Sequence, residues 1–184
     1  MVVRGRYGNL RGEFFMFCKN DYVNYRTQGV CKIEEIRFIQ FDPALPGHRY
    51  YILKPIVPHS ADIFVPIDNP GLTQCIRPIL SAQEIDDIIL SVKDQKLSWE
   101  KDRKRRATAF KNILLKHDER ELLLLIDCLY VKWKEDAKGV SSTDLQFLKT
   151  AENMIEQEFS FSLQMAAKDV GSYIRNKLGL SEFA

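Results

Sequence analysis

Cysteine and histidine are scarce in this sequence, and their positions do not suit a metal site. The cysteines at positions 18, 31, 75 and 128 lack the spacing of about two to four residues that zinc ligands show. The three histidines also lack metal-ligand spacing. We therefore expect reduced, mostly buried thiols, no bound metal and no cofactor.

Long apolar runs and enzyme motifs are absent too. No apolar run approaches the ~20 residues that a membrane-spanning helix needs, so we expect no membrane partner. No GxSxG, Walker or HExxH pattern occurs. A pair such as Cys31 with His48 stays open as a nucleophile and base, without further support. We expect a cytoplasmic protein that is not an enzyme.

Net charge is also small, because 27 lysines and arginines face 25 acidic residues, for a formal charge of +2. Such a chain has no general attraction for polyanions, so any nucleic-acid surface has to be local. One segment, LSWEKDRKRRATAFK at residues 97–111, concentrates basic residues behind one of the two tryptophans, Trp99. This pattern is typical of nucleic-acid binding. The alternatives are a solvated helix face and a tryptophan that packs in the core.

The first half of the chain has the pattern of short strands. Residues 1–15 show no clear period, and Met16 is a second plausible start, so we expect a leader there that was either added to the protein or results from a start site placed too early. Turn signals such as DPALPG and NPG separate apolar stretches, and the strands we expect are residues 21–25, 30–39, 49–56, 62–66 and 73–76. NPG favours a type II turn. Residues 16–78 are therefore predicted to form a small SH3-like or Tudor-like β-barrel.

The second half, residues 79–184, changes to helical periodicity. Ser81 and Glu84 form a capping-box pattern, and Ser98 is expected to cap the next helix. A leucine stripe that includes Trp133 predicts a buried helix face, and a long helix is expected from Ser141 onward. The fold class is therefore α+β in two domains, a small barrel followed by an all-α bundle. A helix that starts at Ser98 would place Trp99, Arg103 and Arg106 on one face.

Several segments taken together resemble the CarD/CdnL family of bacterial RNA polymerase-binding transcription regulators. The resemblance rests on residues 19–36 (KNDYVNYRTQGVCKIEEI), 50–56 (YYILKPI), 63–86 (IFVPIDNPGLTQCIRPILSAQEID) and 147–159 (FLKTAENMIEQEF), and on Trp99 with its basic segment. Each motif is short, but their order and spacing together are specific. The resemblance covers nearly all of the chain after Met16.

The resemblance implies a function without chemistry. The barrel, similar to the polymerase-interaction domain of transcription-repair coupling factor, would dock on the RNA polymerase β subunit, and Arg37, Ile39 and Phe64 are the candidate contacts. The helical domain would contact promoter DNA at the upstream edge of the bubble and stabilise the open complex. Trp99 would enter the minor groove, and the implied phosphate contacts are Lys101, Arg103, Lys104, Arg105 and Arg106. This role implies association with the nucleoid.

One departure leaves alternatives open. Glu100 and Asp102 separate Trp99 from the basic residues, whereas the family places its basic pair almost directly after the tryptophan. Which arginines would face phosphate therefore stays open. A protein-interaction adaptor without DNA contact is one alternative function, and a barrel protein that contacts structured RNA through the same basic segment is another.

Overall fold

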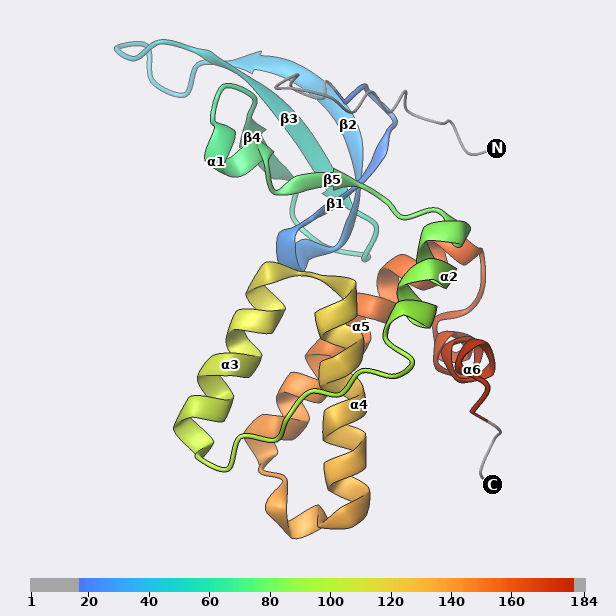
Figure 1. Ribbon diagram of the computed structural model, residues 1–184. Helices are drawn as coiled ribbons and strands as arrows, with labels where there is room; N and C mark the ends of the chain where they lie inside the picture. Colours follow the sequence, from blue (N-terminus) through green and yellow to red (C-terminus); the bar gives the residue numbers. More distant parts are fainter. Residues whose placement is uncertain (1–16, 181–184) are drawn as a thin grey trace. The chain divides into compact units, whose positions relative to one another are not determined.

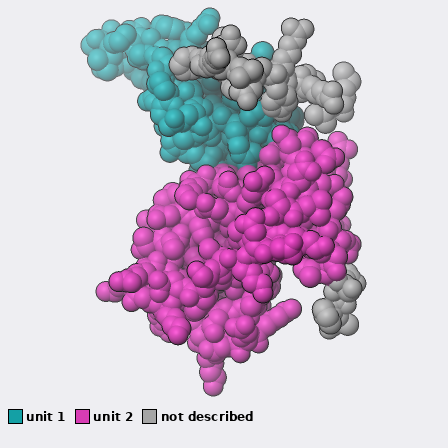
Figure 2. Space-filling view, in the orientation of Figure 1, with its two compact units in different colours: residues 1–79 teal, residues 80–184 magenta. Residues whose placement is uncertain are grey.

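The computed structural model describes residues 17–180 (Figure 1). The chain divides into two compact units, residues 1–79 and residues 80–184 (Figure 2). The first unit contains the strands and one short helix, and the second contains the long helices. The expected order of a β-rich half followed by a helical half is confirmed. The leader predicted for residues 1–15 lies outside the described residues.

The strands of the first unit form one antiparallel sheet in the order β4-β3-β2-β1-β5. The strands are β1 (Tyr22–Tyr25), β2 (Val30–Ile39), β3 (His48–Pro55), β4 (Ile63–Pro66) and β5 (Ile76–Pro78). β4 and β5 are its two edge strands, and no pairing joins them within residues 17–180. The sheet itself is thus confirmed, whereas its closure into a barrel is not.

One face of this sheet carries the apolar core of the first unit. Successive side chains on a strand point to opposite faces, and the members of this core cluster on β3 and β4 are accordingly Tyr51, Leu53 and Val65. The β2–β3 register shifts between Ile33 and Glu35, so a bulge there adds one residue to β2. Beyond the bulge, Glu35 to Ile39 of β2 pair with β3 in the shifted register. This register determines which of their side chains lie on the face opposite the core.

The segment at residues 69–71 is a helix start and not the predicted type II turn. The side chain of Asn69 accepts a hydrogen bond from the backbone N–H of Leu72 at 3.2 Å, and Pro70 opens the short helix α1 (Pro70–Thr73). Proline suits the first position of a helix, because its missing N–H would have no partner there. The helix delays the last strand, so β5 begins at Ile76 and not at the predicted residue 73.

The second unit is a bundle of long helices around one apolar core (Figure 1). Its helices are α2 (Ala82–Ser91), α3 (Arg103–Lys116), α4 (Glu119–Glu135), α5 (Ser142–Leu163) and α6 (Ala167–Leu178), with a 3-10 turn η2 (Ala137–Gly139). The predicted capping box of Ser81 and Glu84 is present, and Ser141 forms a second one with Asp144. These caps satisfy backbone N–H groups that have no partner inside the helix.

Two local predictions for this unit were wrong. The helix after α2 begins at Arg103, because the side chain of Asp102 caps it by accepting from the N–H of Arg105 at 2.8 Å. Ser98 therefore lies in the coil before the helix. Trp133 is 47% exposed. It lies in the last turn of α4, beyond the fully buried Leu129, and its ring packs beside that of Tyr130 with centroids 6.5 Å apart.

Among residues 17–180, no helix combines the length and the apolar character that a membrane span requires.

Candidate functional site

The three residues predicted to contact polymerase lie on one face of the sheet. Arg37 pairs with Tyr50 and Ile39 with His48 across β2 and β3, while Phe64 of β4 pairs with Ile52. Directly paired residues point to the same side, and residues two apart on a strand do so as well. The register therefore brings Arg37, Ile39 and Phe64 together on the face opposite the apolar core.

An aromatic cluster that sequence reasoning missed lies on the same face. The ring of Phe41 contacts Tyr50 and Phe64 edge to face, with centroids 5.5 Å and 6.3 Å apart. Phe41 is 71% exposed and Phe64 is 45% exposed. A pocket of about 350 Å³ adjoins the cluster, and the lining residues are Ile39, Phe41, Asp42, Leu45, Pro46, His48 and Tyr50. Exposed apolar side chains that gather in this way are typical of protein–protein contact surfaces.

Charged groups border this apolar surface. The guanidinium of Arg37 donates hydrogen bonds to Glu35, and this interaction lowers the pKa of Glu35 and raises that of Arg37. His48 hydrogen-bonds to Asp68 across the outer face. Arg37 and Ile39 were candidates because their strand matches the family resemblance. The part played by Phe41 depends on the path of the loop after β2, which has no local signal.

The second candidate surface is the basic surface of α3, which comprises Lys101, Arg103, Lys104, Arg105 and Lys111. All five side chains are exposed, and none forms a salt bridge within the described part of the chain. At the other end of α3, Lys116 is paired with Glu121, and on α6 Lys177 is paired with Asp86. The basic run that stands out in the sequence is therefore exposed at these five positions, without carboxylate partners among the described residues.

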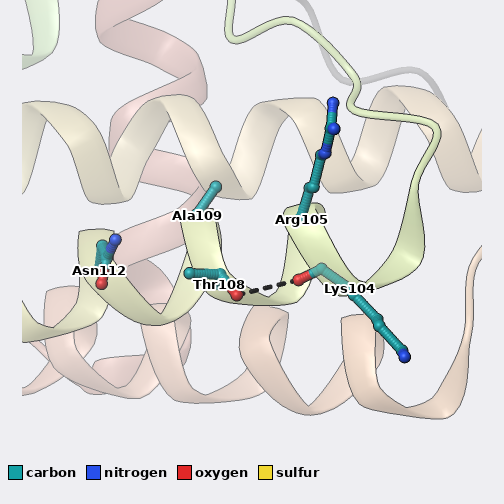
Figure 3. Close-up of a pocket in the computed structure, with 5 residues that line it drawn as sticks. All are labelled: Lys104, Arg105, Thr108, Ala109 and Asn112. Carbon is teal, nitrogen blue, oxygen red and sulfur yellow. Dashed lines mark hydrogen bonds between the residues drawn. The ribbon is translucent and has the colours of Figure 1, made fainter.

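A hollow of about 410 Å³ follows the exposed face of α3 (Figure 3). Its lining residues are Lys104, Arg105, Thr108, Ala109 and Asn112. The long side chains of Lys104 and Arg105 extend from the helix in different directions, and the shorter Thr108 and Ala109 follow along the same helix. The hydroxyl of Thr108 donates to the carbonyl of Lys104 at 3.0 Å. The surface therefore combines long cationic groups with small side chains that leave room beside them.

The N-terminus of α3 places these cations against the helix dipole. Arg103, Lys104 and Arg105 occupy the first turn, which contains no acidic residue. A cation at this positive end costs about 0.3–1 kcal/mol at an exposed position. The capping carboxylate of Asp102 offsets part of that repulsion. An anion bound here would gain from both the cations and the free N–H groups of the first turn.

Arg106 differs from the other basic residues, because it is only 2% exposed. Its Nε and Nη2 donate to the two carboxylate oxygens of Asp144 at 3.0 Å and 2.8 Å, and its Nη1 donates to the carbonyl of Glu100 at 2.9 Å. The predicted common face of Trp99, Arg103 and Arg106 was wrong, since Trp99 precedes the helix and Arg106 points into the bundle. We leave Arg106 out of the candidate phosphate contacts.

The ring of Trp99 is partly buried against the core of the helical unit. The guanidinium carbon of Arg106 lies 4.3 Å from the ring centroid, a cation–π geometry. Phe110 meets the ring edge to face at 6.3 Å, and Nζ of Lys132 lies 5.9 Å from its centroid. Trp99 is therefore held by defined neighbours while part of its surface stays accessible.

The charge states of the buried pair follow from its hydrogen bonds. Burial by itself raises the pKa of Asp144, but hydrogen bonds from Arg106 and Ser141 outweigh it and hold that pKa below its ordinary value. The hydrogen bond with Asp144 likewise raises the pKa of Arg106. Sequence reasoning missed Asp144. Its capping pattern with Ser141 is local and was available, but its partner Arg106 lies 38 positions earlier in the chain.

The nucleophile and base that the sequence left open do not meet. Cys31 pairs with Pro55 at one end of the β2–β3 ladder, and His48 pairs with Ile39 at the other. Eight residues of strand separate these ends, roughly 26 Å at about 3.3 Å per residue. Burial also raises the pKa of the Cys31 thiol to about 11, which disfavours the thiolate. Among residues 17–180, no three potential ligands from histidine, cysteine, aspartate and glutamate gather as a metal site would require.

Comparison with known proteins identifies the first unit. A search of curated protein sequences finds no match to the chain. Residues 17–80 do match the family model of the CarD-like/TRCF RID domain, and the match spans every strand of the sheet together with α1. The specific assignment of the whole chain to CarD/CdnL stays a prediction. Residues 17–80 are therefore similar to the CarD-like/TRCF RID domain, a domain type whose presence implies the RNA polymerase β subunit as partner.

Proposed function

We propose that this chain is a transcription regulator of the CarD/CdnL type, which docks on the RNA polymerase β subunit and stabilises the open promoter complex. The single observation that carries the polymerase part is the match of residues 17–80 to the CarD-like/TRCF RID domain. The promoter part is supported by the basic surface of α3 beside Trp99. The protein performs no chemistry in this proposal. It shifts an equilibrium because it binds the open state better than the closed one.

The outer face of the sheet is the proposed polymerase contact. Phe41 and Phe64 supply exposed aromatic area, and Arg37 supplies a cation at its border. Aromatic and arginine side chains are enriched among the residues that dominate binding energy. The edge strand β4 also leaves backbone N–H and C=O groups available to a strand of the partner. Apolar contact and strand pairing would thus reinforce each other at one site.

The basic surface of α3 is the proposed DNA contact. Unpaired lysines and arginines release counterions when they neutralise phosphates, which gives affinity without sequence preference. The accessible part of the Trp99 ring would enter the minor groove and press against a base step. An apolar wedge costs a few kcal/mol of unstacking in intact duplex. That cost is smaller where the strands have already separated, so the wedge favours the edge of a bubble.

One experiment with the full chain tests both contacts separately. We expect Phe64→Ala to weaken binding to RNA polymerase about tenfold, as loss of a central aromatic contact does. Trp99→Ala should keep polymerase affinity and shorten the half-life of the open complex after a competitor challenge. Phe38→Ala is the matched control, because Phe38 on β2 is also exposed but points to the opposite face. An unchanged open-complex half-life with Trp99→Ala would exclude the wedge.

A protein-interaction adaptor without DNA contact is the second candidate. The packing of the Trp99 ring against Phe110 and Arg106 favours it, since a tryptophan held in this way also serves a purely structural role. The adaptor predicts that the chain shows no salt-dependent association with forked promoter DNA. Binding that weakens steeply as salt rises would decide for the regulator.

A further inference from the structure

The side chain of Arg106 joins three separate segments of the helical unit. It belongs to α3, binds the carboxylate of Asp144 at the start of α5, and donates to the carbonyl of Glu100 in the coil that carries Trp99. A longer contact of 3.4 Å reaches the carbonyl of Lys101. One buried guanidinium therefore links the coil before α3 to the bundle next to Trp99.

The same guanidinium also fixes the ring. Its central carbon lies over the Trp99 ring while its N–H groups donate to Asp144 and Glu100, so one group contacts both the coil and the indole. The edge-to-face contact with Phe110, with centroids 6.3 Å apart, is a second contact that restricts the ring. A lysine could supply the charge but not the planar fork, which is pre-organised for several hydrogen bonds at once.

Asp144 is held in place by further hydrogen bonds at the start of α5. Its Oδ2 also accepts from the backbone N–H and the hydroxyl of Ser141, at 2.9 Å and 2.7 Å, in the capping box of α5. Both side chains of the ion pair are 3% exposed. Removal of either partner leaves a buried charge without its counterion, which the surrounding structure can relieve only by rearranging.

We propose that Arg106 and Asp144 are positioning residues that hold Trp99 at the angle and depth required for its contact with DNA. This inference rests on the proposed function, since it concerns the use of Trp99. Arg106 contributes no phosphate contact in this role and acts only through the tryptophan. The exposed Lys101 and Arg103 flank the same fixed coil. The Arg106–Asp144 pair, which we call the clamp, therefore also sets their spacing from the indole.

Fluorescence of Trp99 tests the clamp without DNA. In Trp133→Phe protein, Trp99 is the one remaining tryptophan. We expect Arg106→Lys, Arg106→Gln and Asp144→Asn to shift its emission to longer wavelength and to increase quenching by acrylamide. Val170→Ala is the control for general destabilisation, because Val170 is fully buried on α6, which packs on α2 and α5. Unchanged Trp99 emission and quenching in folded Arg106 variants would overturn the clamp.

Open-complex lifetime then tests the positioning role. Arg106→Lys should shorten the half-life toward that of Trp99→Ala, and the double variant should fall no further, because both changes remove one interaction. Arg105→Gln should instead add to Trp99→Ala, since Arg105 is exposed and reaches phosphate independently. Additivity between Arg106→Lys and Trp99→Ala would overturn the positioning role. A wild-type half-life with Trp99→Ala would overturn the proposed function and the positioning role, while the fluorescence result would still report on the clamp.

Discussion

At the residue scale, two arginines that are adjacent in the sequence have opposite environments. Arg105 is exposed and lines the hollow on α3, whereas Arg106 is buried in an ion pair with Asp144. A run of basic residues gives no sign of this division. The helical period was the signal that separates them, because Arg106 precedes Phe110 by four residues and Ile113 by seven and so shares their buried face of α3.

The buried pair makes a testable contribution to stability. Asp144→Asn removes the counterion of Arg106 and weakens the cap of α5, so we expect a loss of about 3 kcal/mol in the free energy of unfolding at pH 7. Urea titration measures this change. Asp127→Asn, an exposed change on α4, is the control and should alter stability by no more than about 0.5 kcal/mol. A similar small effect for Asp144→Asn would contradict the importance of the pair.

The same variant has a defined pH dependence. The folded state holds the pKa of Asp144 below the ordinary value of 3.8, so its carboxylate contributes stability above that value and loses it as pH falls through the lower folded pKa. The stability difference between wild type and Asp144→Asn should therefore be constant near neutrality and shrink below about pH 4. A difference that grew on acidification would mean that the carboxyl is protonated in the folded protein.

At the element scale, the first four strands were predictable, whereas β5 and the start of α3 were not. Alternation in β2 and the prolines of the following loop are local signals, and the observed β2 has the predicted bounds of residues 30–39. The capping box of α2 is equally local. By contrast, Asn69 caps a helix where the sequence favoured a turn, and Asp102 caps a helix that the sequence placed from Ser98 onward. Trp133 continues the leucine stripe in the sequence, but it lies in the last turn of α4, beyond the buried part of the helix.

The first turn of α3 predicts opposite effects on stability and binding. Arg103→Glu replaces a cation by an anion at the positive helix end, and we expect a gain of about 0.5–1.5 kcal/mol in the free energy of unfolding. Affinity for forked promoter DNA should fall because a phosphate contact is lost. Lys111→Glu is the matched control: it makes the same charge change on the same exposed helix away from the end, so affinity should fall without the gain in stability. Thermal unfolding and DNA titration measure the two effects.

At the scale of the whole molecule, a net charge of +2 hides a strongly local distribution. Lysines and arginines outside the basic surface of α3 include several that are paired with carboxylates, among them Lys32, Arg37 and Lys177. The basic surface of α3 therefore gives a phosphate backbone several exposed cations close together on the helical unit. Clustering of this kind was visible in the sequence, whereas the absence of acidic partners depended on folding.

The salt dependence of DNA binding measures that clustering directly. If Lys104 and Arg105 each neutralise one phosphate, the double change to glutamine should reduce the slope of log Kobs against log salt by about 1.8, or about 0.9 per contact. Lys149→Gln with Lys168→Gln removes the same charge from exposed positions on α5 and α6 and should leave the slope nearly unchanged. Equal slopes for the two double variants would mean that DNA responds only to net charge. A slope that is reduced only in the α3 double variant would locate the phosphate contacts on this helix, next to the clamped Trp99.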